Sequence, residues 1–198
     1  MNRYTELARE MRSAIGGRRR ADHSIRVARC AELLAMRHGI DAARARTAGM
    51  LHDVARMWPA SRLLEEALGR GYPVDDFERR NPIVLHAPLG ATIAAERFAV
   101  RDPEVAAAIA AHTLGAAEMS PLAQVLYLAD ALEPGRDYPE RRQLWELAMR
   151  DLDAAMYATL ERTLAYSRSR GFEIAPRTKA ALDTFSRMKG KVSTVSTH

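Results

Sequence analysis

Three sites in the sequence join a helix-capping residue to a proline, and they constrain the fold more than any other feature of the chain. The three dipeptides are Asn81-Pro82, Asp102-Pro103 and Ser120-Pro121. Asn, Asp and Ser side chains cap helix N-termini, and proline suits the first helical position because no hydrogen-bond donor is needed there. Each pair therefore predicts the start of a helix.

The rest of the sequence also favours helices, because alanine is abundant and no run alternates between apolar and polar residues. Beyond the three segments above, we expect helices over Arg3 to Ile15, about His23 to His38, near Asp41 to Val54, after Pro139 to near Gly171, and about Pro176 to near Gly190. A chain of 198 residues usually forms one core. The sequence therefore predicts an all-α, single-domain helical bundle over residues 1–190 and a disordered C-terminal tail over residues 191–198.

Four of the six histidines and one aspartate fall where apolar side chains are expected. They continue apolar stripes at helical spacing, and they are His23, His52, His86, His112 and Asp130. A single inward histidine is usually a hydrogen-bonded core residue, and a single aspartate often caps a helix. An unpaired buried carboxylate is costly, however, and one shared cation would satisfy all of these groups. The pattern alone leaves a metal site and ordinary core residues as equal alternatives.

The dipeptide His52-Asp53 adds a second aspartate to this set. Neighbouring residues on a helix diverge by about 100°, so they act together only at a helix end or when two metal ions share the carboxylate. Ala48 and Gly49 precede the pair and are small enough to let another element come close. The spacing permits a site here without establishing one.

Charge and composition narrow the class of partner. Lys and Arg number 30 against 25 Asp and Glu, which gives a net charge of +5 and suits a polyanionic ligand or a solvated arginine-rich surface. The single cysteine, Cys30, excludes an internal disulfide. No apolar run is long enough to span a membrane, and the N-terminus lacks the apolar stretch of a signal peptide. We therefore expect a cytoplasmic protein without a membrane partner.

The order His23, His52-Asp53, His86, His112 and Asp130 resembles the HD-domain phosphohydrolase superfamily in its six-ligand form. The surrounding sequence resembles the YqeK-like family of bacterial symmetrical diadenosine tetraphosphate hydrolases, from about Arg19 to the last predicted helix. The matching sequence segments are RRRADHSIRVA, AGMLHDVAR, NPIVLHAPLGA, AAHTLGAAEMSPL and YLADALEPGRDYP. The resemblance implies an HD-type bundle with a dinuclear centre, in which all six residues bind metal and Asp53 is shared. It implies iron, although manganese, cobalt, zinc and magnesium also suit this kind of site.

The implied activity is the cleavage of diadenosine tetraphosphate into two ADP by attack of metal-bound hydroxide on a β-phosphorus. Arginine stays charged and can hold phosphate through two hydrogen bonds, so arginines near the ligands are candidates for substrate binding. The predicted catalytic residues are Asp53, Arg56 and Arg136, and the predicted substrate-binding residues are Arg20, Arg26, Thr113, Gly115 and Arg136. At Arg56 the family commonly has lysine, so the fine geometry there departs from the pattern. Arg26 is equally consistent with a surface position.

Other functions fit parts of these observations. Another HD-domain nucleotidase or dNTP phosphohydrolase would share the metal ligands and differ only in its substrate pocket. A diiron oxygenase would share them too, but it leaves the nearby arginines without a role. A non-catalytic nucleic-acid-binding module would explain the positive charge, but aromatic residues are only 6% and no recognition motif is present. We expect a nucleotide substrate and no nucleic-acid partner, and a homodimer is left open.

Overall fold

The computed structural model describes the backbone of residues 3–195 and the side chains of residues 4–188, and the regular structure in this range is entirely helical. Its elements are α1 (Arg3–Ile15), α2 (Arg18–Arg37), α3 (Ala42–Leu51), α4 (Ala60–Gly69), α5 (Asp76–Arg80), the 3₁₀ turn η1 (Pro82–Leu85), α6 (His86–Arg97), α7 (Pro103–Ala111), α8 (Pro121–Leu132), α9 (Arg141–Ala148), α10 (Leu152–Ser169) and α11 (Pro176–Val195). The predicted all-α class is confirmed. None of the helices in this range is long and apolar enough to cross a membrane.

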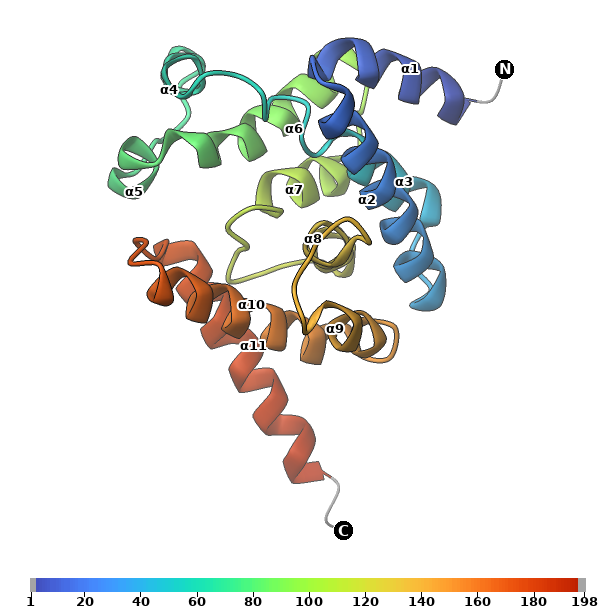
Figure 1. The fold of residues 1–198 in the computed structure, drawn as a ribbon, viewed down its shortest axis with the longest axis vertical. Helices are drawn as coiled ribbons and strands as arrows, with labels where there is room; N and C mark the ends of the chain where they lie inside the picture. The colour runs from blue at the N-terminus through green and yellow to red at the C-terminus, as the bar shows by residue number, and fades with distance from the viewer. Residues whose placement is uncertain (1–2, 196–198) are drawn as a thin grey trace.

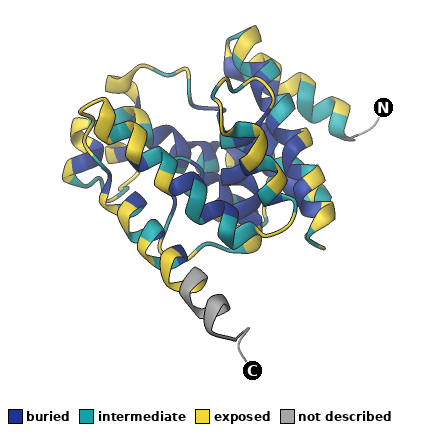
Figure 2. Ribbon diagram, turned by 60° about the horizontal axis from the view of Figure 1, so that its bottom comes forward, coloured by how far each residue is buried: buried dark blue, intermediate teal, exposed yellow. Residues whose placement is uncertain are grey.

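Helix α8 lies in the middle of the bundle (Figure 1). It contacts α2, α3, α7, α9 and α10. Most of its residues are buried, as expected for a helix that is apolar on nearly all sides. Figure 2 shows the same arrangement as a buried interior beneath exposed outer faces. A polar side chain on α8 can therefore face the interior, where other helices surround it.

Two of the three predicted helix starts are confirmed by their caps. The Asp102 side chain accepts hydrogen bonds from the first amides of α7, and the Ser120 hydroxyl accepts one from the amide of Ala123 in α8. Asn81 behaves differently, because its side-chain amide donates to the carbonyl of Phe77 in α5 and does not cap the next helix. Pro82 therefore begins only the turn η1, and α6 starts at His86.

Other predicted boundaries also differ from the structure. Helix α3 ends at Leu51, before the expected Val54, and the pair His52-Asp53 lies in the turn that follows it. Helix α2 begins at Arg18, five residues before the expected start at His23. The long helix expected after Pro139 is divided into α9 and α10, because the Asp151 side chain caps a new helix by accepting from Ala154. Helix α11 continues past Gly190 to Val195, since no proline follows and a glycine inside a helix costs only about 1 kcal/mol. It thus covers the first part of the predicted tail, and residues 196–198 lie outside the described residues.

Two glycines allow neighbouring helices to approach the end of α3. A Cβ atom on Gly49 would lie 2.7 Å from the Cα atom of Ala28 in α2. A Cβ atom on Gly90 in α6 would lie 3.1 Å from the carbonyl oxygen of His52. The predicted close approach at Gly49 is confirmed. These contacts bring side chains of α2 and α6 toward His52.

The apolar core has two parts that meet at this point. The larger part lies between α1, α2, α3, α7, α8 and α10, and it includes Leu51. The smaller part lies under α4, η1 and α6, and it includes Val54. His52 and Asp53 come between Leu51 and Val54 in the chain. The junction between the two apolar clusters is therefore occupied by polar side chains.

Candidate metal centre

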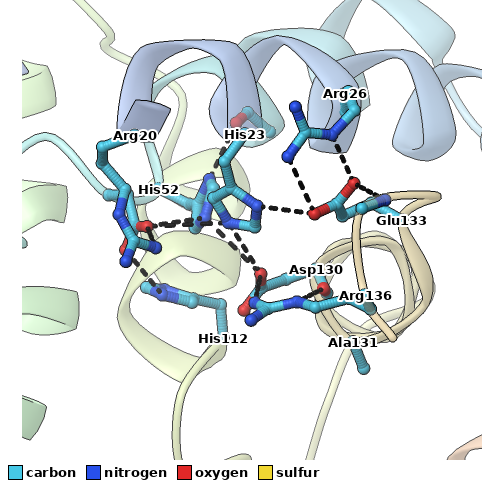
Figure 3. A network of polar contacts seen from close by, with 12 residues as sticks. Arg20, His23, Arg26, His52, His112, Asp130, Ala131, Glu133 and Arg136 are labelled. Carbon is cyan, nitrogen blue, oxygen red and sulfur yellow. Dashed lines mark hydrogen bonds and ion pairs between the residues drawn. The ribbon is translucent and has the colours of Figure 1, made fainter. Parts of the chain in front are cut away.

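The structure brings all six predicted metal ligands together at the junction between the two cores. Figure 3 shows several of these side chains pointing toward one another from different helices. All are buried except Asp130, which is partly exposed. They are His23 in α2, His52 and Asp53 directly after α3, His86 at the start of α6, His112 directly after α7, and Asp130 in α8.

Three of the histidines have the same local geometry. The Nδ1 atoms of His52, His86 and His112 each donate to the carbonyl oxygen three residues earlier, at 2.8, 2.5 and 2.7 Å respectively. Each histidine stands at a helix end, where the carbonyl groups are not all used by the regular hydrogen bonds of an α-helix and can accept from a side chain. A carbonyl oxygen only accepts, so Nδ1 carries the hydrogen and Nε2 keeps its lone pair. This is the tautomer in which Nε2 can bind a metal ion.

His23 reaches the same tautomer in another way. It lies inside α2, where the backbone carbonyls are used by the helix itself. Its Nδ1 atom instead donates to Oε1 of Glu133, 3.0 Å away. All four histidines therefore direct an Nε2 lone pair into the centre of the site.

The Nε2 atoms form two groups around the carboxylate of Asp53. Those of His23 and His52 lie 3.7 and 3.4 Å from Oδ2 of Asp53. Those of His86 and His112 lie 3.3 and 3.8 Å from its other oxygen, Oδ1. The side chain of Asp53 thus stands between two pairs of histidines and offers one oxygen to each pair.

Asp130 belongs to the first of these groups. Its Oδ1 atom lies 3.0 Å from Nε2 of His23 and 3.8 Å from Nε2 of His52. The ligand atoms of His23, His52 and Asp130 all lie within 4.8 Å of one another, and so do those of His52, Asp53 and His112. Each of these two sets, which share His52 and do not include His86, is compact enough to hold a metal ion.

Unsatisfied nitrogen atoms show that a cation fits these residues. The Nε2 atoms of His23 and His52 are buried and make no hydrogen bond within the described part of the chain. The Nε2 atoms of His86 and His112 face each other at 3.2 Å, although both rings carry their hydrogen on Nδ1. Two lone pairs at this distance repel each other. A divalent cation resolves both problems, because neutral imidazole and carboxylate are its usual ligands.

The ionisation states of both carboxylates and of His112 agree with this interpretation. His52 differs, because burial alone would lower its pKa but the neighbouring carboxylates of Asp53 and Asp130 raise it. Burial alone would raise the pKa of the Asp130 carboxyl, but its contact with His23 holds that pKa far below the usual range. The pKa of Asp53 is likewise lowered against the effect of burial, mainly by His52. Burial and the neighbouring histidines lower the pKa of His112 to about 3. The site therefore combines two ionised carboxylates with a neutral imidazole, as metal binding requires.

Two of the predicted arginines lie at the site. Arg20 donates from Nη1 to Oδ2 of Asp53 at 2.7 Å. Arg136 donates from Nε to the carbonyl oxygen of Asp130 at 2.9 Å and from Nη2 to its carboxylate. Arg56 follows Asp53 in the same turn and is half-buried, and it makes no side-chain hydrogen bond or ion pair within the described residues.

The other predicted substrate-binding residues have different surroundings. Arg26 is directed at Glu133, with Nε 2.6 Å from Oε2. The Thr113 hydroxyl lies 3.2 Å from Nε2 of His86 and 3.1 Å from Nε2 of His112, at the edge of the second group. Gly115, which was predicted to bind substrate, has a backbone amide that already donates to the carbonyl of Ala111 at 2.8 Å. Its φ of +71° makes it a turn residue at the end of the helix.

Glu133 is the residue of this site that the sequence analysis missed. It stands just after α8, it is buried, and it contacts both His23 and Arg26. The sequence held one weak signal for Glu133, since this glutamate lies inside the segment YLADALEPGRDYP, which carries part of the family resemblance.

The fold and the site define the class of protein. Residues 20–135, which include all six converging side chains, match the HD domain family. The chain belongs to this family, whose hydrolases are metal-dependent, and the predicted HD-type bundle is confirmed.

The names of individual relatives state a more specific activity than the name of the family does. The chain is 30% identical to the protein named "Bis(5'-nucleosyl)-tetraphosphatase, symmetrical" of Bacillus subtilis, over 79% of this chain and 83% of that protein. It is 32% identical to the protein of the same name from Halalkalibacterium halodurans, over 81% of this chain and 86% of that protein. A solved structure from Clostridium acetobutylicum, described as a "predicted HD superfamily hydrolase involved in NAD metabolism", has a TM-score of 0.88 and 29% identity, covering 93% of this chain and 97% of that one.

Proposed function

We propose that this chain is a metal-dependent hydrolase that cleaves diadenosine tetraphosphate symmetrically into two ADP. The observation that carries the proposal is the carboxylate of Asp53, which offers one oxygen to each of two groups of histidines. The relatives named symmetrical bis(5'-nucleosyl)-tetraphosphatase give the substrate and the symmetry of cleavage. The cytoplasmic location and the oligomeric state stay predictions from the sequence.

The proposed centre is dinuclear. One divalent ion would be held by His23, His52 and Asp130 and the other by His86 and His112, and Asp53 would contribute to both. Two such ions would lower the pKa of water and compensate charge on the phosphoryl oxygens. We propose iron on the basis of the family resemblance, and this donor set also suits manganese, cobalt, zinc or magnesium.

The arginines around the centre are proposed to bind the tetraphosphate. Arg20 and Arg136 each use only part of their five N–H donors on the carboxylates, so donors remain for phosphate oxygens. Arg56 lies three residues after Asp53 and has no ion-pair partner among the described residues, so its guanidinium is available to the substrate. The positive charge of these groups would orient the polyphosphate chain and stabilise the charge that develops on the departing ADP.

Thr113 is proposed to act on the other side of the centre. Its hydroxyl lies within hydrogen-bond distance of the Nε2 atoms of both His86 and His112. A hydroxyl has one hydrogen to donate and two lone pairs to accept with, so it can orient a water molecule or a phosphate oxygen there.

The test is anaerobic turnover of diadenosine tetraphosphate with added ferrous iron, with the products separated by chromatography. ADP as the sole nucleotide product is expected. ATP together with AMP would refute symmetrical cleavage. A parallel panel of mononucleotides and dNTPs tests the alternative HD-domain activities, and faster hydrolysis of one of these would replace the proposed substrate. Protein with full metal content but no turnover of diadenosine tetraphosphate would also refute the substrate.

A further inference from the structure

We infer that Glu133 is a positioning residue that holds His23 in place and thereby sets the metal affinity of one half of the centre. This half, made by His23, His52 and Asp130, is called the His23 position below. The inference rests on the dinuclear centre of the proposed function, and it assigns a role to Glu133, Arg26 and Gly135 that concerns the metal and not the substrate.

His23 depends on a distant side chain because its own helix offers it no acceptor. The other three histidines stand at helix ends and are fixed by carbonyl groups three residues away. His23 lies within α2, whose carbonyl groups are engaged along the helix. Among the residues whose side chains are described, its Nδ1 atom is fixed by Glu133 alone, which is 110 positions further along the chain.

The carboxylate of Glu133 is itself fixed on all sides (Figure 3). It is 1% exposed. Arg26 donates to Oε2 from Nε at 2.6 Å and to Oε1 from Nη2 at 3.2 Å. The backbone amide of Gly135 donates to Oε2 at 2.6 Å, and His23 donates to Oε1 at 3.0 Å. With both oxygens engaged, the carboxylate cannot rotate away from His23 without losing several hydrogen bonds.

The same contacts explain why Arg26 and Gly135 stand beside Glu133. The guanidinium of Arg26 compensates the buried negative charge of Glu133. Without such a partner, a buried carboxylate would destabilise the folded protein. A Cβ atom at position 135 would lie 2.6 Å from Nη2 of Arg26 and 2.9 Å from Oε1 of Glu133. Only glycine leaves room for this ion pair. Arg26, which the sequence analysis assigned to substrate binding, therefore acts through Glu133.

A carboxylate bound to the far nitrogen of a histidine orients the ring and makes the other nitrogen a stronger ligand. Loss of such a partner typically lowers metal affinity by about 10- to 100-fold. Because Glu133 touches His23 and neither His86 nor His112, the loss falls on the His23 position alone. Excess metal then restores occupancy, since the ligands themselves are intact.

The experiment is a titration of metal-free protein with Mn²⁺, followed by calorimetry and by the electron paramagnetic resonance signal of free Mn²⁺. In wild-type protein two binding steps are expected. Glu133→Gln is expected to lower the Mn²⁺ affinity of one binding step by about 10- to 100-fold and to leave the affinity of the other step unchanged. Hydrolysis by this variant is expected to return to the wild-type kcat at high Mn²⁺, which damage to the fold would not allow.

Glu32→Gln is the matched control. It removes another ion pair of α2, in which Arg46 donates to Glu32 at 2.9 Å, away from the histidines. Its two binding steps are expected to equal those of the wild type. Where Glu133→Gln does not fold, as judged by circular dichroism, Arg26→Gln replaces it, because it removes two of the hydrogen bonds to Glu133 and is expected to weaken the same step.

The outcomes separate the inference from the proposed function. Wild-type protein that binds no metal would overturn both. Two binding steps in the wild type with identical steps in the folded Glu133→Gln or Arg26→Gln variant would overturn the inference and leave the proposed function standing. An equal weakening of both steps would also overturn it, because the effect would then be general.

Discussion

Gly49 offers a test of how closely α2 and α3 must pack for the site to form. In Gly49→Ala the new Cβ atom would meet backbone atoms of Ala28, with Cα at 2.7 Å and N at 2.9 Å. Backbone cannot rotate out of the way, so the two helices must separate. Overpacking of this kind costs about 1–3 kcal/mol, and the upper end applies here because no side chain can yield. Alanine recovers about 1 kcal/mol by its better helix propensity.

The net expected loss is about 1–2 kcal/mol, which corresponds to a fall in Tm of about 2–8 °C for a chain of this size. Gly69→Ala is the matched control, since Gly69 ends α4 and its Cβ atom would meet nothing within 4 Å. That variant is expected to gain about 0.5–1 kcal/mol. Calorimetry of the two metal-free variants measures both melting temperatures. If Gly49→Ala melts at or above the temperature of Gly69→Ala, the close packing of α2 on α3 is refuted.

Three further predictions follow from the site and its surroundings. Asp130→Ala is expected to lose both bound metal and turnover, as measured by elemental analysis and by hydrolysis assay, and full activity would remove Asp130 from the site. Burial raises the pKa of the Cys30 thiol to about 11, so iodoacetamide is expected to label the folded protein at pH 8 only as fast as it unfolds. Burial alone would raise the pKa of Glu133, but hydrogen bonds from Arg26 and Gly135 lower it to about 2. This stabilisation is present above pH about 4.5 and is lost as the pH falls toward 2, so denaturation curves of metal-free wild type are expected to lose more stability over this range than those of Glu133→Gln.

The sequence predicted the parts of the fold that depend on local signals. Capping by Asp102 and Ser120 marked the starts of α7 and α8, because a cap acts within a single turn. Helices α4 and α5 were not predicted. α5 begins with a capping box formed by Asp75 and Glu78, which is a readable signal, but the helix has only five residues. Its Glu78 also accepts from Tyr72, a contact that helical periodicity does not reveal.

The candidate site was predictable for a different reason. Ionisable side chains such as His112 and Asp130 interrupt apolar stripes, so their unusual position can be recognised without knowing the fold. Glu133 does not interrupt a stripe, because it follows the end of α8. Its partners His23 and Arg26 are 110 and 107 positions away, and no local pattern connects them. The substrate-binding roles of Arg26 and Gly115 were assigned from proximity in sequence alone, which cannot show where a guanidinium or an amide is already engaged.

The position of the site at the junction of two apolar cores has a consequence for how the protein matures. Its six converging residues extend along the chain from His23 to Asp130, and no single helix supplies more than one of them except at the pair His52-Asp53. A ribosome must therefore release α8 before the last of these groups is available, and both cores must close before the groups meet. Contacts between such distant segments form late, because the chain must first be ordered between them. The complete set of six side chains is therefore expected to converge only late in folding.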